Sequence, residues 1–498
     1  MIHLLRGFVL ALSMLAGACL LEPAQAAGPI GLQWVDSQKV EQIIGDNDWA
    51  DGKPTTSRTF SRFGVLANGL GYSFEHFDTA RARQELIFLF GDTVAFGSYS
   101  PSPGLDRNAG PVGAAVSVDF SQPQPRFECV QGPNDPFAVP CEQSQYNYHG
   151  KDPIAWSTTT DPQAGLRLDF FTKGRFPLFV EPSRFDGKRV KTGGDDIPNS
   201  GVSVNGKIYI VFSTGADPSC GTSCSHAHAY SVLVEFDEAR QTFTTLRQIS
   251  SVPKGGHFLF TSFHEPARGT AAEPVVYMFG VGDYRHSNVY LAKVPTATFE
   301  SGIGTQYLTA VNNGVPVWSP PDAAGVSYET DAQPVVIDDA PSPSVGNVSV
   351  AYEEKLKLWL LTYDADGSSP PATRGVFLRS ATSPWGPWSD PIPIYNACDN
   401  GGFGVAGKGG FIHYARSKGG AVCNLAAVSP SGPGGPTIAE ELGQHDPEST
   451  VGATFAPLMI ERFLSVNNDV LSVYYTMSTW NPYTVVEMRT DLSVLHSP

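Results

Sequence analysis

The sequence predicts an all-β protein, a five-bladed β-propeller that forms a single domain. A unit made of a β-patterned segment, a turn, a second strand and a polar stop recurs five times along the chain. Repeated sheets with equivalent ends are typical of propellers. The composition, with 51 Gly and 40 Pro among 498 residues, indicates a folded, turn-rich chain. Helical patterning is limited to two short segments, 237–241 and 437–442.

The five units share one layout. The paired strands are predicted at 71–76 with 86–91, 201–204 with 208–213, 257–263 with 275–279, 347–352 with 356–363, and 454–463 with 470–477. The polar stops follow at 90–93, 212–214, 280–284, 362–364 and 477–480. Asn205-Gly206 predicts a tight hairpin turn within the second pair. Segments 289–294, 375–379 and 485–489 are predicted as outer strands of their blades.

Residues 1–26 have the pattern of an export signal. Arg6 supplies a positive charge, residues 8–21 are apolar, and Ala24-Gln25-Ala26 is a small-x-small cleavage pattern. The apolar stretch is short for a membrane span, so no span is predicted. We therefore expect a secreted or periplasmic protein.

Two segments are expected after the export signal, and the N-terminal segment itself has one alternative interpretation. A lead-in without clear period is expected at 27–57, and the propeller is expected at 58–498. In the alternative, Cys19 carries a lipid anchor. This reading is weaker because Ala16 stands at the third position before Cys19, where a larger aliphatic residue is usual.

Cysteine usage agrees with export. The chain has 7 Cys, and removal of the signal removes Cys19. The other six form pairs that are close in sequence, and we expect the disulfides Cys129–Cys141, Cys220–Cys224 and Cys398–Cys423. A zinc site built from Cys220, Cys224, His226 and His228 is the alternative. An even cysteine count in an exported chain favours the disulfides.

The charge of the chain limits its partners. The formal net charge is -16, whereas proteins that bind nucleic acids concentrate Lys and Arg on their surface. We therefore expect no nucleic-acid partner. A neutral ligand such as a polysaccharide or oligosaccharide fits this charge better.

A propeller would bring the polar stops together. The innermost strand of each blade begins at the rim where the second strand ends, so these positions line one central funnel. Paired carboxylates in an open funnel suit glycoside hydrolysis, in which one acid protonates the leaving oxygen and another activates water or attacks the sugar. The candidate catalytic residues are Asp92, Asp196 and Asp283. The candidate substrate-binding residues on this rim are Asp195, His257, Arg285, Asn347, Asp364, Trp480 and Asn481.

Each candidate also has a structural interpretation. An Asp at a strand end is often a turn former that bonds its own backbone. Asp283 could form a structural ion pair with Arg285, and His413 could be buried after the apolar pair Phe411-Ile412. A propeller that binds carbohydrate without turnover, or that serves as a protein-interaction scaffold, would share the same fold.

Four motifs carry a family resemblance. They are Leu86-Ile-Phe-Leu-Phe-Gly-Asp-Thr93, the segment 282–292, Pro384-Trp-Gly-Pro-Trp-Ser389 and the segment 475–483. Together they resemble a secreted bacterial domain-of-unknown-function family, over about residues 60–492. Some of its members are endo-D-arabinanases, five-bladed propeller glycoside hydrolases that act on mycobacterial-type arabinan.

The resemblance implies specific roles. Asp92 would be a catalytic-type carboxylate, and Arg285, His413 and Trp480 would lie near the substrate. Two positions depart from the family pattern: Gly69 stands where relatives often carry Asp, and Asn347 stands where many carry Glu.

The predicted function is that of a secreted glycoside hydrolase acting on a polysaccharide of the arabinan type. The alternative is a non-catalytic carbohydrate-binding propeller. A monomer without a cofactor is expected, although converging oxygen ligands would also suit a structural Ca²⁺.

Overall fold

The computed structural model describes most of the chain. The described residues are 30–48, 50–63, 65–95, 115–119, 126–130, 152–173, 176–185, 187–190, 197–215, 228–265, 274–338, 343–365, 375–397, 400, 402, 404–405, 408–409, 411–412, 454–479 and 484–496. Strands dominate these parts, and the α-helix among them is α1 (Thr59–Phe63). None of the helices described has the length and hydropathy that a membrane crossing requires.

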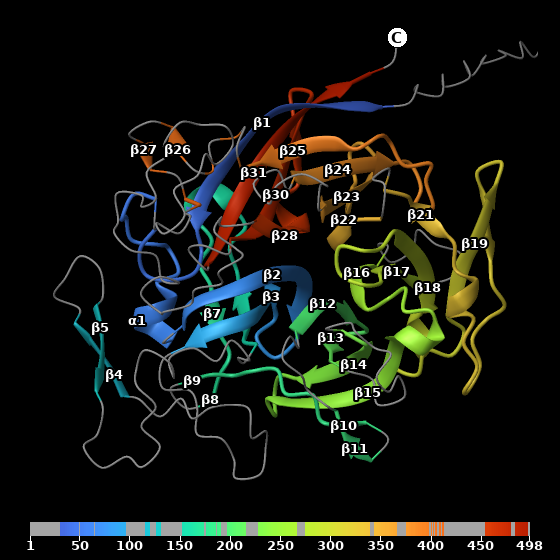
Figure 1. Cartoon of the computed structure of the whole chain (residues 1–498), viewed down its shortest axis with the longest axis horizontal. Helices are drawn as coiled ribbons and strands as arrows, with labels where there is room; N and C mark the ends of the chain where they lie inside the picture. The colour runs from blue at the N-terminus through green and yellow to red at the C-terminus, as the bar shows by residue number, and fades with distance from the viewer. Residues whose placement is uncertain are drawn as a thin grey trace, which may run out of the picture.

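Five antiparallel sheets stand around a common centre, which confirms the predicted five-bladed propeller (Figure 1). From the centre outward, the first blade consists of β2 (Val65–Asp78), β3 (Arg83–Ala95), β6 (Ile154–Ser157) and β7 (Asp169–Phe170). The second consists of β12 (Ile197–Val204), β13 (Lys207–Thr214), β14 (Tyr230–Asp237) and β15 (Thr242–Ser251). The fourth consists of β22 (Val345–Glu353), β23 (Leu358–Ala365), β24 (Gly375–Ala381) and β25 (Ile392–Asn396).

The third blade is extended by strands that follow the predicted outer strand 289–294. Its strands are β16 (Phe260–His264), β17 (Val275–Val281), β18 (Val289–Pro295), β19 (Gln306–Asn312) and β20 (Val315–Trp318), with β21 (Pro334–Val336) also paired to β18. β16 begins at Phe260, so His257 lies in the approach to the strand and not within it as predicted. Smaller pairs outside the blades are β4 (Ala115–Asp119) with β5 (Arg126–Val130), β8 (Thr172–Lys173) with β9 (Phe176–Pro177), β10 (Arg184–Phe185) with β11 (Lys188–Arg189), and β26 (Gly404–Val405) with β27 (Lys408–Gly409).

The fifth blade joins the two ends of the chain. Its order is β28 (Thr454–Met459), β30 (Val470–Thr479), β31 (Thr484–Leu495) and β1 (Gly31–Gln42), with β29 (Ser465–Asn467) beside β30. β1 runs antiparallel to β31, with Gly31 opposite Leu495. A strand within the predicted lead-in therefore completes the ring, and the sequence pattern did not indicate this role. The reason is that β1 is an outermost strand with mostly exposed or half-buried residues, so it lacks an apolar period.

The core lies between neighbouring blades. Val211 and Leu233 of the second blade belong to one buried cluster with Val276 and Met278 of the third. The second strand of a blade is covered on both faces by adjacent sheets, and every residue of β13 after the first is buried. Continuous apolar runs such as 208–212 are therefore required, as expected for strands buried on both faces.

Short hydroxyl side chains link neighbouring blades near the centre of the propeller. These bonds run from Val350 N to Ser262 Oγ (3.0 Å), from Met459 N to Ser349 Oγ (2.9 Å) and from Leu70 N to Ser478 Oγ (2.7 Å). Ser478 belongs to one of the predicted polar stops, and Ser213 in another stop bonds to Leu259 O. These two serines therefore hold neighbouring blades together, so at these two polar stops the side chain has a structural role.

Candidate functional site

One end of the propeller collects the starts of the inner strands and the ends of the second strands. The register places Ile197 opposite Ser213, Phe260 opposite Val281, Val345 opposite Ala365, and Thr454 opposite Thr479. Contacts between blades confirm that these positions share one end, because Arg285 N donates to Val345 O and Asn199 Nδ2 donates to Leu259 O. We call this end the funnel face.

Three of the predicted substrate-binding residues meet on the funnel face. Asp364, in β23, is 2 % exposed. Its Oδ1 accepts a hydrogen bond from Asn347 N at 2.8 Å. Its Oδ2 lies 3.4 Å from both Nε and Nη2 of Arg285. The third and fourth blades are thus joined by a buried carboxylate and a guanidinium.

The local backbone explains this arrangement. Arg285 has a positive φ of 61°, a conformation that turns the chain sharply after β17. A Cβ at Gly346 would come within 2.5 Å of Asp364 Oδ2, so only glycine leaves room for the carboxylate. The Arg285 guanidinium lies 4.6 Å from the centre of the Tyr284 ring, which holds it further. Asp364 therefore orients Arg285, whose side chain is less buried than its own.

Asp283 lies in the same turn but is partly exposed. Its Oδ2 is 3.8 Å from His286 Nδ1, and its carbonyl accepts a hydrogen bond from His286 N. Of the two described acids on this part of the face, Asp283 is open to solvent and Asp364 is enclosed.

A second group of polar atoms lies where the first blade meets the funnel face. The pairing of β2 with β3 shifts between Ala67 and Gly69, which face Val94 and Gly91. Asn68 therefore stands opposite Asp92 and Thr93 in a bulge, a feature over-represented next to active sites. Asn68 is fully buried, and within the described part of the chain neither Oδ1 nor Nδ2 has a hydrogen-bond partner.

Thr93 is a second buried polar residue in this bulge. It is 7 % exposed, and its Oγ1 is also without a partner among the described residues. A buried polar group without a partner costs about 1–3 kcal/mol, so such groups call for a water, an ion or a ligand. Asn68 was missed in the sequence because Asn68-Gly69 reads as a turn signal. The feature that could have identified it is a polar Asn within an inner strand of the propeller.

His257 lies in a different group. Its ring stacks on Tyr290 of β18 with 4.0 Å between centroids, and its backbone N donates to Glu329 Oε1 at 2.8 Å. Burial lowers the pKa of His257 and raises the pKa of Glu329 to about 7. The ring is therefore neutral at neutral pH. Glu329 comes from the connection after the outer strand, and the sequence pattern did not connect it with His257.

For several of the predicted site and disulfide residues, the structure describes only the backbone or does not describe the residue. The backbone of Asp92 lies in β3, at the bulge, and the backbone of Cys129 lies in β5. The remaining positions lie outside the described residues: Asp195, Asp196, His413, Trp480, Asn481, Cys141, Cys220, Cys224, Cys398 and Cys423. Their roles stay predictions. Among described residues, the acidic group that could jointly hold a metal ion lies on the opposite face of the propeller.

Solved structures similar to this chain share little sequence with it. A Bacteroides ovatus protein is 10% identical, over 86% of this chain and 87% of that one, with a TM-score of 0.40. The catalytic domain of a Coprinopsis cinerea GH62 α-L-arabinofuranosidase is 10% identical, over 93% and 97%, with a TM-score of 0.36. A Bacillus subtilis arabinanase is 10% identical, over 68% and 85%, with a TM-score of 0.33. Scores this low carry no argument about activity.

The sequence comparisons establish the family. A search of curated proteins found no match. A family model described as a domain of unknown function, DUF4185, matches residues 127–489. This match spans most of the chain, from β5 to β31, and agrees with the resemblance seen in the sequence motifs. The chain therefore belongs to the DUF4185 family.

Proposed function

We propose that this protein is an exported glycoside hydrolase that cleaves an arabinan-type polysaccharide at the funnel face. The observation that carries the proposal is the bulge of the first blade. There the backbone of Asp92 lies beside a fully buried Asn68 whose amide has no partner among the described residues. Polar atoms that are left unpaired beside a carboxylate position suit a guest with many hydroxyl groups.

The chemistry needs two carboxyl groups. In this proposal, Asp92 is one member of the pair and Asp283 or Asp196 is the other. One acid donates its proton to the glycosidic oxygen as the C–O bond breaks. The second carboxylate takes a proton from the attacking water, or attacks the sugar itself. A separation of about 5–5.5 Å between the groups favours retention, and about 6.5–9.5 Å favours inversion.

Arg285 would bind the substrate. Asp364 and the Tyr284 ring hold its guanidinium from the protein side. The guanidinium could donate to sugar hydroxyls, and a pre-oriented guanidinium loses little entropy when it does so. Asp364 is a positioning residue in this scheme, because its two oxygens already accept hydrogen bonds from Asn347 and Arg285.

A non-catalytic carbohydrate-binding propeller is the second candidate. Its supporting observation is that Asp364 is enclosed in contacts with Arg285 and Asn347, so this acid is not free for proton transfer. Asn347, an amide residue where many relatives carry Glu, adds no further acid.

One assay separates the two candidates. The purified protein is incubated with arabinan, and new reducing ends are measured together with oligosaccharide binding by calorimetry. We expect release of reducing ends, and Asp92→Asn should reduce kcat by about 10²–10⁴-fold with binding retained. Asp237→Asn, which removes an acid from the opposite face, is the matched control and should keep full activity. Binding without product from the unaltered protein would support the binder instead.

A further inference from the structure

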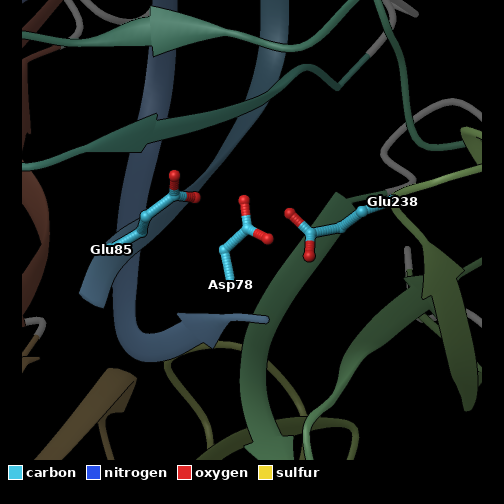
Figure 2. A group of neighbouring side chains, drawn as sticks. All are labelled: Asp78, Glu85 and Glu238. Atoms are coloured by element: carbon cyan, nitrogen blue, oxygen red, sulfur yellow. The ribbon is translucent and has the colours of Figure 1, made fainter. Parts of the chain in front are cut away.

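Three carboxylates converge on the face of the propeller opposite the funnel face. Asp78 ends β2, Glu85 lies near the start of β3, and Glu238 follows β14. One oxygen of each lies within 4.8 Å of the others. Figure 2 shows Asp78 between the other two, with the three carboxyl groups turned toward one another. The group therefore bridges the first and second blades.

The contacts of Glu85 leave one oxygen unaccounted for. The residue has no exposed surface. Its Oε1 is 2.5 Å from Arg83 Nη2 and 3.7 Å from Arg81 Nη1. Its Oε2 is buried and has no hydrogen-bond partner in the described part of the chain. An oxygen of a buried carboxylate in this condition calls for a cation or a donor.

Glu238 shows the same pattern from the second blade. Its Oε2 accepts a hydrogen bond from His76 Nε2 at 2.9 Å, while its buried Oε1 has no partner among the described residues. His76 Nδ1 is bonded to Ser203 Oγ at 2.9 Å, so the ring is fixed on both sides. Such outer hydrogen bonds are how proteins orient the carboxylates that hold metals.

The two arginines do not complete the group. Arg81 and Arg83 are substantially exposed and approach from the outside, where Arg81 Nη1 binds Asp78 Oδ2 at 2.6 Å. Three carboxylates thus face two guanidinium groups, so the side of the group that points away from the arginines has an excess of negative charge. The two oxygens without a partner among the described residues belong to Glu85 and Glu238, which come from different blades and are both members of the converging group.

We propose that Asp78, Glu85 and Glu238 form a calcium site that links the first and second blades. All ligands are oxygens, which suits a hard cation, and Ca²⁺ accepts carboxylates in flexible geometry with water completing its shell. Glu85 Oε2 and Glu238 Oε1 would be the ligand atoms that bridge the blades. The site is separate from the funnel face, so it stands whether or not the protein hydrolyses glycans.

Calcium binding to the whole purified chain tests this proposal. After treatment with EDTA and its removal, CaCl2 is titrated by calorimetry, and Tm is followed in parallel. We expect one saturable site, and Tm should rise by about 3 °C at 100-fold excess over Kd. MgCl2 should have a smaller effect because Mg²⁺ gives up its water reluctantly.

Two variants assign the site. Glu85→Gln and Glu238→Gln keep the side-chain shape but remove one charge each, and both should weaken Ca²⁺ binding at least about tenfold. Glu354→Gln is the control, because it removes one charge from an exposed position outside the group and should leave Kd unchanged. The absence of a saturable Ca²⁺ effect on the unaltered protein would overturn the proposal. Equal affinity in the Glu238→Gln variant would overturn it as well, even if Glu85→Gln failed to fold.

Discussion

Arg285 and Asp364 are 79 residues apart in the sequence, yet Asp364 Oδ2 lies 3.4 Å from two nitrogens of the Arg285 guanidinium. The contact joins the third and fourth blades at the funnel face. Because Asp364 is almost fully buried and Arg285 is less so, the carboxylate is the fixed partner. The pair therefore presents a pre-oriented cation at the end of the propeller where the inner strands begin.

Asp364→Asn tests this pair. Removing one partner of a buried ion pair costs about 3 kcal/mol or more, because the other charge is left uncompensated. We expect a decrease of that size in the free energy of unfolding, measured by urea denaturation. Glu354→Gln, a change at an exposed position, should show no measurable change. An Asp364→Asn protein as stable as the unaltered one would mean that the pair contributes nothing.

Gly346→Ala tests the space that Asp364 requires. The added Cβ would lie 2.5 Å from Asp364 Oδ2, so the carboxylate would have to move away from Asn347 N. Overpacking of this kind costs about 1–3 kcal/mol, and we expect that loss in urea denaturation. The matched control is Gly31→Ala, whose Cβ would make ordinary contact at 3.5 Å from Leu495. A comparable loss in both variants would point to a general effect of the substitution.

Asn68→Leu separates stability from function. The buried amide of Asn68 has no partner among the described residues. Replacing it by an apolar group of similar size removes a desolvation cost, so stability should stay equal or rise by about 1–2 kcal/mol. Turnover of arabinan should fall by at least about tenfold, because the amide that lies beside the Asp92 backbone in the bulge is lost. Urea denaturation and reducing-end release measure the two effects. A variant that is destabilised without loss of turnover would assign Asn68 to the core.

Glu487→Gln tests the pH dependence of stability. Glu487 is fully buried in β31 and faces Glu41 of β1. Burial, with the charge of Glu41 adding to it, raises the pKa of Glu487 to about 8. The folded protein therefore binds this proton more tightly than the unfolded chain does. Its contribution to stability is full below about pH 4.5 and is lost as the pH rises through about 8.

The expected result is a flatter stability profile. Glu487→Gln should match the unaltered protein at pH 5 and exceed its Tm at pH 9, because no carboxylate has to be charged in the core. Glu41, whose pKa burial also raises, will keep part of the slope. Glu354→Gln, an exposed change, should leave the profile as it is. An unchanged slope in the Glu487 variant would contradict the assignment.

The strands and turns of each blade were predictable because they depend on local sequence. Asn205 and Gly206 have φ values of 53° and 77°, as the Asn-Gly signal indicates for a hairpin turn. Strand boundaries were less certain. The predicted strand 454–463 ends at Met459 and is followed by a 3-10 turn at Glu461–Phe463, and the next turn centres on Asn468 and Asp469 with positive φ.

Contacts between blades were not predictable from those patterns. Asp364 was expected in the funnel, but its partner Arg285 depends on how the third and fourth blades pack. The same holds for Glu238, which reads as a surface residue after a strand yet lies beside Asp78 and Glu85 of another blade. No local period carries information about which side chains from separate sheets will meet.

The sequence by itself determined that the chain builds five hairpin-based sheets with polar residues at equivalent ends, because alternation and turn chemistry act over a few residues. The tertiary structure alone decided that β1 closes the ring, that Asn68 is enclosed without a partner among the described residues, and that acids from two blades converge opposite the funnel face. These features depend on the packing of segments separated by tens to hundreds of residues, where the free energy of burial and pairing is shared between sheets.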